Sequence, residues 1–388
     1  MQIWFMPWAD LGQELRLGPV IFWPFKKMAK SKIQDQSVLT HLHRYFGYYV
    51  DHRGQSVDTI TICSRRTNDF RVLRGQKASD IRKASDALIF TIISDATKAA
   101  VCTNNRTLGP PSADRYELLT QNFQPGNNHL SIQAGSLLSG GWKIGDISFP
   151  MPWCLGGSFG SPNDKIIQGF DRAFGRGIPK DFRDRLFRAL EWFRLAHTES
   201  DKVSSVSKVV MMATAFEIVL NLPMVGDKSG RFADELEKRC AITQSLRQTR
   251  LDRKGKNQTR AKVAWWGWDF YKLRNAIVHG DVIRPRQLKY LCQTRTWLSQ
   301  LIVADLVFWQ CVTKDLYDHD CIGSEARSLS ASLDKLFPDE PSGSAEQFCV
   351  ESFFQFDKVH RAFGWARKRT KKKKIKPPKE KLTDLSPA

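Results

Sequence analysis

The sequence lacks the features that mark membrane, secreted and zinc-ribbon proteins. No stretch reaches about 18 uncharged apolar residues, so we expect no membrane-spanning helix. The eight cysteines include no CxxC pair, which argues against a zinc ribbon and indicates no disulfide framework, as in a reducing cytosol. The apolar start at residues 1–8 is short and has no basic n-region, so we expect no signal peptide.

Acidic residues are too few to balance the basic ones. The chain has 60 Lys and Arg against 40 Asp and Glu, a net charge of +20 over 388 residues. This excess indicates a polyanionic partner, such as RNA, DNA or an anionic membrane. Residues 361–388 carry +9 of it and residues 1–360 the other +11, so both parts are basic. A hydrophobic content of 41% excludes global disorder.

The first 165 residues have the pattern of a strand-rich, mixed α/β domain without a catalytic motif. Two aromatic runs, at 3–8 and 20–25, each carry a proline near the end, which suits edge strands. Residues 59–63 and 70–73 also have strand character. Residues 79–87 predict a short helix that leads into a β-branched strand at 88–93. We expect His41 and His43 to be surface or packing residues.

After a Gly-rich linker at 156–162, the apolar period becomes helical. Four stripes predict a bundle of four or five helices from about 178 to 318, the last helix starting at Pro285. The stripes are Leu186, Leu190, Phe193 and His197; Val206, Val210, Ala213, Glu217 and Leu220; Val263, Trp266, Phe270, Leu273 and Ile277; and Leu288, Leu291, Leu298, Leu301, Asp305, Phe308 and Val312. A shorter helix is expected at about 229–240, and His197 is expected to be structural.

The predicted fold class is therefore α+β. We divide the chain into a strand-rich, mixed α/β domain at 1–165, a helical bundle at 166–320, accessory helices at 321–365 and a Lys-rich tail at 366–388. The tail is either a solubilising terminus or a sequence-independent tether to RNA or the ribosome.

The most informative segment lies at 271–281 and contains Arg274, Asn275 and His279 in an Arg-Asn-x-x-x-His pattern. On a helix, Asn275 and His279 are i,i+4 neighbours on a face away from the apolar stripe. Gly280 is a natural C′ residue, so His279 lies in the last turn, where the helix dipole favours imidazolium. A proton-transferring histidine beside an arginine suits phosphodiester chemistry. We expect no metal and no other cofactor.

The phrase Leu273-Arg274-Asn275-Ala276-Ile277-Val278-His279-Gly280, late in such a bundle, closely resembles the HEPN superfamily, in particular its Apea-like branch from bacterial defence proteins. The helices at 189–193 and 213–220 resemble that branch as well. The resemblance covers about 180–315.

This resemblance implies a metal-independent endoribonuclease that dimerises, so that two motifs form one cleft. Attack by the neighbouring 2′-OH would leave a 2′,3′-cyclic phosphate. His279 would take the acid/base role, Arg274 would hold the phosphate, and Asn275 would orient or donate. Such proteins often act in the cytoplasm as toxins or abortive-infection effectors, cutting tRNA or other RNA when a phage-derived trigger is sensed. By analogy, the first 165 residues would then be the sensor or regulatory part.

Further residues are expected to support this site. Glu217 lies on an apolar stripe, and it pairs with Arg274 or another cation of the bundle or else lies at a solvent edge. Tyr271 precedes the motif. The basic loop at 247–260 is either a solvated loop or a phosphate-binding segment. The RNA-binding candidates are Lys254, Lys256, Arg260 and Lys272.

Two other interpretations stay open. His279 could be a helix-end residue and Arg274 a surface ion-pair partner, in which case the bundle would be a non-catalytic nucleic-acid-binding or regulatory dimerisation module. Trp265 and Trp268 share the face of His279, and could form a dimer contact or a platform for bases.

Overall fold

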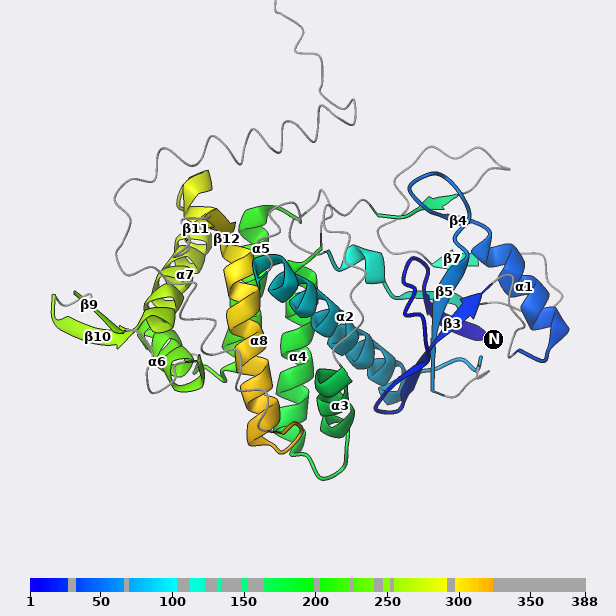
Figure 1. Cartoon of the computed structure of the whole chain (residues 1–388), viewed down its shortest axis with the longest axis horizontal. Coiled ribbons are helices and arrows are strands. Elements are labelled where there is room, and N and C mark those ends of the chain that lie inside the picture. Colours follow the sequence, from blue (N-terminus) through cyan, green and yellow to red (C-terminus); the bar gives the residue numbers. More distant parts are fainter. Residues whose placement is uncertain are drawn as a thin grey trace, which may run out of the picture. The chain divides into compact units, whose positions relative to one another are not determined.

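The computed structural model describes residues 1–26, 33–65, 70–102, 112–122, 131–133, 148–152, 164–198, 203–223, 226–240, 247–251, 255–291 and 297–323. By their contacts the residues form two units, 1–340 and 341–388, and the second lies wholly outside the described part. The predicted linker at 156–162, the accessory helices expected after residue 323 and the tail at 366–388 also lie outside it. The fold class is α+β, as expected (Figure 1).

A six-stranded antiparallel sheet forms the N-terminal part, in the order β2-β3-β5-β1-β6-β7. Its strands are β1 (Gln2–Met6), β2 (Leu15–Leu17), β3 (Val20–Lys26), β5 (Thr59–Ser64), β6 (Leu119–Asn122) and β7 (Ser131–Gln133). A separate parallel pair joins β4 (Tyr49–Val50) to β8 (Phe149–Pro150).

Alternation along the strands gives the sheet two apolar faces. Ile3 and Phe5 of β1 pack in a core with the helix α1 (Gln36–Phe46). Trp4 and Met6, which point the other way, belong to the core of α2 (Gln76–Cys102) and the bundle. Both faces are therefore covered by helix (Figure 1).

The aromatic runs at 3–8 and 20–25, predicted to be edge strands, form β1 and β3. Both are interior strands, because β1 lies between β5 and β6, and β3 between β2 and β5. Pro24 is nevertheless tolerated, since the short β2 pairs only with Val20 to Phe22 and leaves Pro24 with the β5 neighbour alone. The strand expected at 70–73 was wrong. The Phe70 carbonyl accepts one bond from the Gln2 amide, at 2.7 Å, in place of a ladder.

The helix-then-strand prediction for 79–93 was also wrong, because α2 is one helix of 27 residues. Its segment from Ala87 to Ile93 is buried on every side. A helix enclosed by core on all sides has no polar face, so its 3.6-residue period cannot be read from the sequence.

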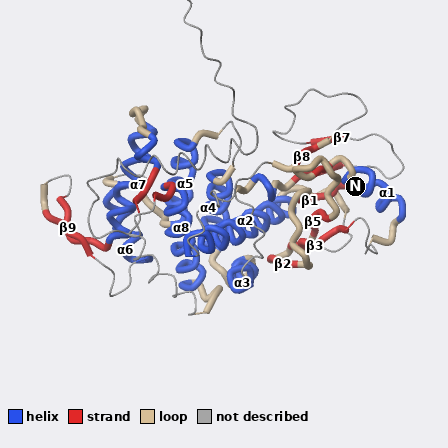
Figure 2. Tube along the Cα trace, turned by 45° about the horizontal axis from the view of Figure 1, so that its top comes forward, coloured by secondary structure: helices blue, strands red, loops and turns tan. Residues whose placement is uncertain are grey.

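Six further helices complete the bundle (Figure 2). They are α3 (Asp164–Ala173), α4 (Lys180–Ala196), α5 (Ser205–Val219), α6 (Lys228–Cys240), α7 (Lys262–Val278) and α8 (Gln300–Asp318). The stripes predicted for α4 and α7 are confirmed, since Leu186, Leu190, Val263 and Phe270 are buried. One core runs from Trp4 to Ile322 across residue 165, because α2 packs against α4 and α8.

Two bundle predictions need correction. In α5 the buried face contains Val209, Met212 and Phe216, while Val206 and Val210 lie at its border. The last helix begins at Gln300 and not at Pro285, because the Ser299 hydroxyl caps it by accepting from the Leu301 amide. The residues before it form the 3₁₀ helix η2 (Pro285–Leu288) and the strand pair β11 (Lys289–Leu291) and β12 (Trp297–Ser299). Among the described residues, no helix has both the length and the apolar character needed to cross a bilayer.

A buried polar contact ties α2, α4 and α8 together. His197, just after α4, lies with Nε2 2.9 Å from Asp305 Oδ1, and both side chains are fully buried. Thr97 of α2 donates to the other carboxylate oxygen at 3.3 Å, and the His197 Nδ1 lies 2.7 Å from the Phe193 carbonyl. Such a contact fits the structural role expected for His197.

Replacing Asp305 by Leu should lower the free energy of unfolding by about 3–5 kcal/mol, because it leaves the His197 imidazole buried without its partner. Urea unfolding followed by circular dichroism measures the loss. The double variant Asp305→Leu/His197→Phe should recover part of it. A single variant as stable as wild type would contradict the assigned role of this contact.

Candidate functional site

The end of α7 carries the motif residues in the predicted arrangement. His279 is the C-cap of the helix, and its amide donates to the Asn275 carbonyl at 2.9 Å. Gly280 follows with φ +82°, the left-handed conformation expected of a C′ glycine. Asn275 is partly exposed and His279 is exposed, so both lie off the apolar stripe.

Arg274 is fixed by three neighbours. Its Nη2 lies 3.2 Å from Glu217 Oε1, and its Nη1 donates to the Asn275 side-chain oxygen at 3.2 Å. The guanidinium also lies over the Tyr271 ring, 5.5 Å from the centroid. The side chain keeps 21% of its surface exposed, so it can still reach a ligand.

Glu217 of α5 links three helices. Its Oε1 accepts a 2.5 Å hydrogen bond from the Tyr271 hydroxyl of α7, and Lys228 of α6 lies 3.9 Å from its Oε2. Of the two alternatives that the sequence left open for Glu217, the structure shows the pairing with Arg274, and 19% of the Glu217 side chain remains exposed. Burial, and then the hydrogen bond to Glu217, raise the pKa of Tyr271, so its phenol stays protonated and donates.

The structure does not bring His279 into contact with Arg274. Within the described part of the chain, the His279 imidazole has no hydrogen-bond or ion-pair partner. Its apolar neighbours Val278 and Val282 are 52% and 92% exposed. The end of α7 is therefore an open surface with an unpaired imidazole and two exposed valines.

The basic segment before α7 is a hairpin, β9 (Arg247–Leu251) and β10 (Asn257–Ala261), and not the loop expected from the sequence. Arg260 bonds Asp234 at 2.5 Å and lies over the Trp268 ring. Arg260 therefore holds the hairpin to the helices, while Lys256 at the hairpin turn is exposed. Lys254 lies outside the described residues.

The hairpin also packs against the tryptophans on α7. Trp265 and Trp268 are buried, and the Trp265 Nε1 donates to the Gln248 carbonyl at 2.7 Å. Their burial leaves neither side chain open for the two roles that the sequence suggested, a dimer contact or a platform for bases. Lys272, exposed on α7, lies 5.4 Å from the Trp268 ring centroid.

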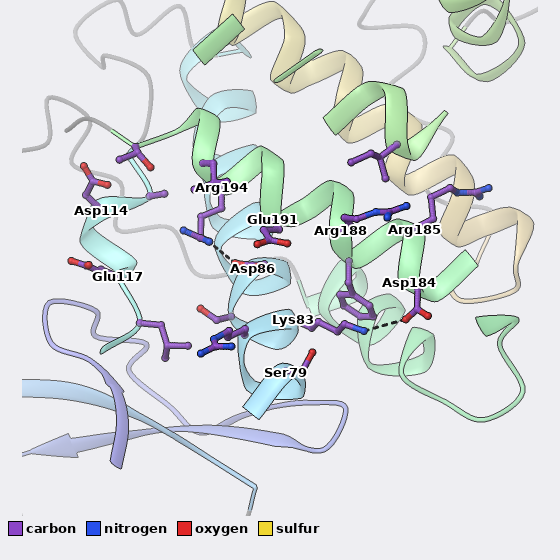
Figure 3. Close-up of a pocket in the computed structure, with 18 of the residues that line it drawn as sticks. Ser79, Lys83, Asp86, Asp114, Glu117, Asp184, Arg185, Arg188, Glu191 and Arg194 are labelled. Atoms are coloured by element: carbon purple, nitrogen blue, oxygen red, sulfur yellow. Dashed lines mark hydrogen bonds and ion pairs between the residues drawn. The ribbon is translucent and has the colours of Figure 1, made fainter. Parts of the chain in front are cut away.

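Sequence reasoning missed a large cleft of about 1470 Å³ between α2, α4, α5 and the 3₁₀ helix η1 (Asp114–Tyr116). Its charged walls are joined by two ion pairs, Arg194–Asp86 at 2.6 Å and Lys83–Asp184 at 3.2 Å (Figure 3). Glu217 lines the cleft too, so the carboxylate that holds Arg274 is shared by both features. No sequence spacing marks this cleft, because its lining residues come from several separate elements.

Two acids that line the cleft, Asp86 and Glu117, have raised pKa values. Burial raises the pKa of Asp86 to about 6, although the Arg194 guanidinium lowers it. Burial and the neighbouring Asp114 also raise the pKa of Glu117. No group of three or more metal-ligating side chains occurs in the part of the chain that the structure describes.

Comparison with known proteins finds no match: no family model, no curated protein and no solved structure matches the chain.

Replacing Glu217 by Gln should lower the free energy of unfolding by roughly 1 kcal/mol, because the change removes the ion pair to Arg274 but keeps a hydrogen-bonding group. Urea unfolding at low and high salt measures the effect, which should shrink as salt screens the pair. Glu191→Gln, an exposed glutamate on α4, is the matched control and should change little. Equal effects of the two substitutions would contradict the role assigned to Glu217.

Proposed function

We propose that the protein is a metal-independent endoribonuclease of the HEPN type, with Arg274, Asn275 and His279 at its active site. The proposal rests on the resemblance of residues 273–280 to the Apea-like branch. The observation that carries the proposal is the position of the Arg274 guanidinium. Glu217, Asn275 and Tyr271 orient it, and it remains partly exposed.

The position of Arg274 suits a phosphate ligand. A guanidinium has five N–H donors, and the contacts to Glu217 and Asn275 leave others for a phosphoryl oxygen. Charge that develops on the non-bridging oxygens during 2′-OH attack would be stabilised by these donors. Asn275 orients the arginine by accepting one of its N–H groups.

His279 supplies the proton transfer. Its exposed imidazole lies at the C-terminal end of α7, open to a ligand. One histidine takes the proton of the 2′-OH as that oxygen attacks phosphorus. A protonated histidine gives a proton to the departing 5′-oxygen, so the products are a 2′,3′-cyclic phosphate and a 5′-hydroxyl.

A homodimer would complete the site. Acid and base roles suit two histidines, and each chain offers one such motif. The exposed Val278 and Val282 beside His279 provide apolar surface for a second copy. By the same resemblance, we place the enzyme in the cytoplasm, in antiviral defence or growth arrest. The sheet domain would sense a phage-derived trigger.

A second candidate is a non-catalytic module that binds nucleic acid or serves dimerisation. The observation that favours it is that Glu217 neutralises Arg274, while His279 does not contact Arg274 within the chain. In that case Arg274 would be a structural ion-pair partner.

Purified wild type should cleave total RNA in the presence of EDTA, leaving cyclic-phosphate ends. Arg274→Ala and His279→Ala should each lower the rate by about 100-fold or more, the typical effect of losing an acid/base or charge-stabilising group. Gel analysis and end-group mapping by phosphatase sensitivity measure both.

The control variants are Arg16→Ala, an exposed arginine of β2, and His52→Ala, an exposed histidine of the sheet domain. Both should cleave as wild type does. If Arg274→Ala and His279→Ala also cleave at the wild-type rate, the site assignment is wrong.

A further inference from the structure

Two free cysteines from different helices meet inside the bundle. Cys240 is the last residue of α6, and Cys311 lies in the interior of α8. Their sulfur atoms are 3.7 Å apart and both side chains are buried, so the two thiols are in direct contact. The other described free cysteines, Cys63 and Cys321, have no second thiol within this distance among the residues that the structure describes.

An ion pair beside the sulfur atoms holds the two helices in register. Arg239, which precedes Cys240 on α6, pairs with Asp315, one turn after Cys311 on α8. The other carboxylate oxygen of Asp315 lies 3.6 Å from the Arg185 guanidinium of α4. The packing of α6 on α8 therefore brings the two thiols together by construction.

The position of Cys240 gives the pair freedom to react. A disulfide bond is about 2.05 Å long, so the two sulfur atoms must approach each other before they can bond. Helix ends open at a lower free-energy cost than helix interiors, and Cys240 is at such an end. Opening of this last turn exposes the Cys240 sulfur to a small oxidant, and its closing returns the sulfur to Cys311.

We propose that Cys240 and Cys311 form a reversible redox site, at which hydrogen peroxide oxidises the two thiols to a disulfide between α6 and α8. In a reducing compartment such a disulfide is transient and reports an oxidising condition. A metal ion held between the two sulfur atoms would need further ligands, and the described part of the chain offers no group of three metal-ligating side chains.

The first step oxidises Cys240. Its sulfur, as thiolate, attacks one peroxide oxygen, so that an S–O bond forms and the O–O bond breaks. The hydroxide that leaves takes up the proton lost by the thiol and becomes water, and Cys240 becomes a sulfenic acid.

The second step involves Cys311. Burial raises the pKa of its thiol, so Cys311 stays protonated until Cys240 has been oxidised. The Cys311 sulfur then attacks the Cys240 sulfur, the S–S bond forms and the S–O bond breaks. The departing hydroxide takes the Cys311 proton. In total the two thiols lose two electrons, and one peroxide is reduced to two waters.

The disulfide would restrain the part of the chain that carries the motif. The segment between Cys240 and Cys311 contains the hairpin and all of α7, with His279 at its end. Closing this loop removes conformational freedom from the unfolded chain, which raises the stability of the folded protein.

A competing explanation is that the two cysteines are inert packing residues. Buried cysteines behave as small apolar side chains, and their thiols usually do not react. In that case peroxide would leave both thiols free. The two explanations therefore separate when the thiols are counted after oxidation.

The experiment treats the reduced full-length protein with a few molar equivalents of hydrogen peroxide. Remaining thiols are then blocked with N-ethylmaleimide in denaturant, and trypsin digestion is followed by mass spectrometry. Trypsin releases Cys240 in the peptide 240–247 and Cys311 in the peptide 296–314, each as the only cysteine of its peptide. The proteins are wild type, Cys240→Ala, Cys311→Ala and, as matched control at another buried cysteine, Cys63→Ala.

We expect wild type and Cys63→Ala to give the linked pair of peptides 240–247 and 296–314, and dithiothreitol to separate it. In Cys311→Ala, dimedone should trap Cys240 as a sulfenic acid, while in Cys240→Ala the Cys311 thiol should stay free. The proposal is wrong if maleimide still labels Cys240 and Cys311 fully in peroxide-treated wild type, or if either one is linked to a different cysteine.

The linked protein should melt about 5 °C higher than the reduced protein, a rise typical of closing a long loop. Peroxide should produce no such rise in Cys240→Ala or Cys311→Ala. An equal rise in these variants would contradict the assigned cross-link. None of these measurements uses RNA, so the redox site and the proposed nuclease stand or fall separately.

Discussion

The carboxylate of Glu217 is the interaction on which the site depends. A half-buried acid is costly unless cations and hydrogen-bond donors surround it, and three helices supply them here. Tyr271 and Arg274 come from α7 and Lys228 from α6, while Glu217 itself belongs to α5. The same contacts that satisfy this acid fix the guanidinium of the motif. Arg274, the arginine of the proposed active site, is thus positioned by the packing of the bundle and not by its own helix alone.

The scaffold that supports these helices is built around α2. This helix is buried along most of its length, and it joins the inner face of the sheet to α4 and α8. The contact between His197 and Asp305, with Thr97 beside it, fixes its C-terminal half in that core. Because one core includes both sheet and bundle, a change at the sheet has a packed route to α4, whose exposed face lines the cleft. This is a route of contact, and it gives the proposed sensor a physical connection to the site.

The basic side chains that give the net charge of +20 have different roles. Arg250 and Arg260 lie over the tryptophans of α7 and are held by Asp269 and Asp234, so they stabilise the hairpin. Arg188 is exposed and has no partner within the described residues. Composition counts these arginines alike. Only their contacts distinguish a cation that holds the fold from one that can bind a phosphate.

The sequence alone determined the α+β class, the bundle stripes of α4 and α7 and the end of α7 at Gly280. These features depend on local periodicity and on one glycine conformation. For Glu217 the sequence left a cation partner and a solvent edge open, and the tertiary structure chose Arg274 as the partner. The tertiary structure decided the rest. It made α2 one helix, because burial on every side removes the period that a sequence can show. It covered Trp265 with a hairpin, and it assembled the cleft from elements far apart in the chain, since neither depends on any spacing within a single segment.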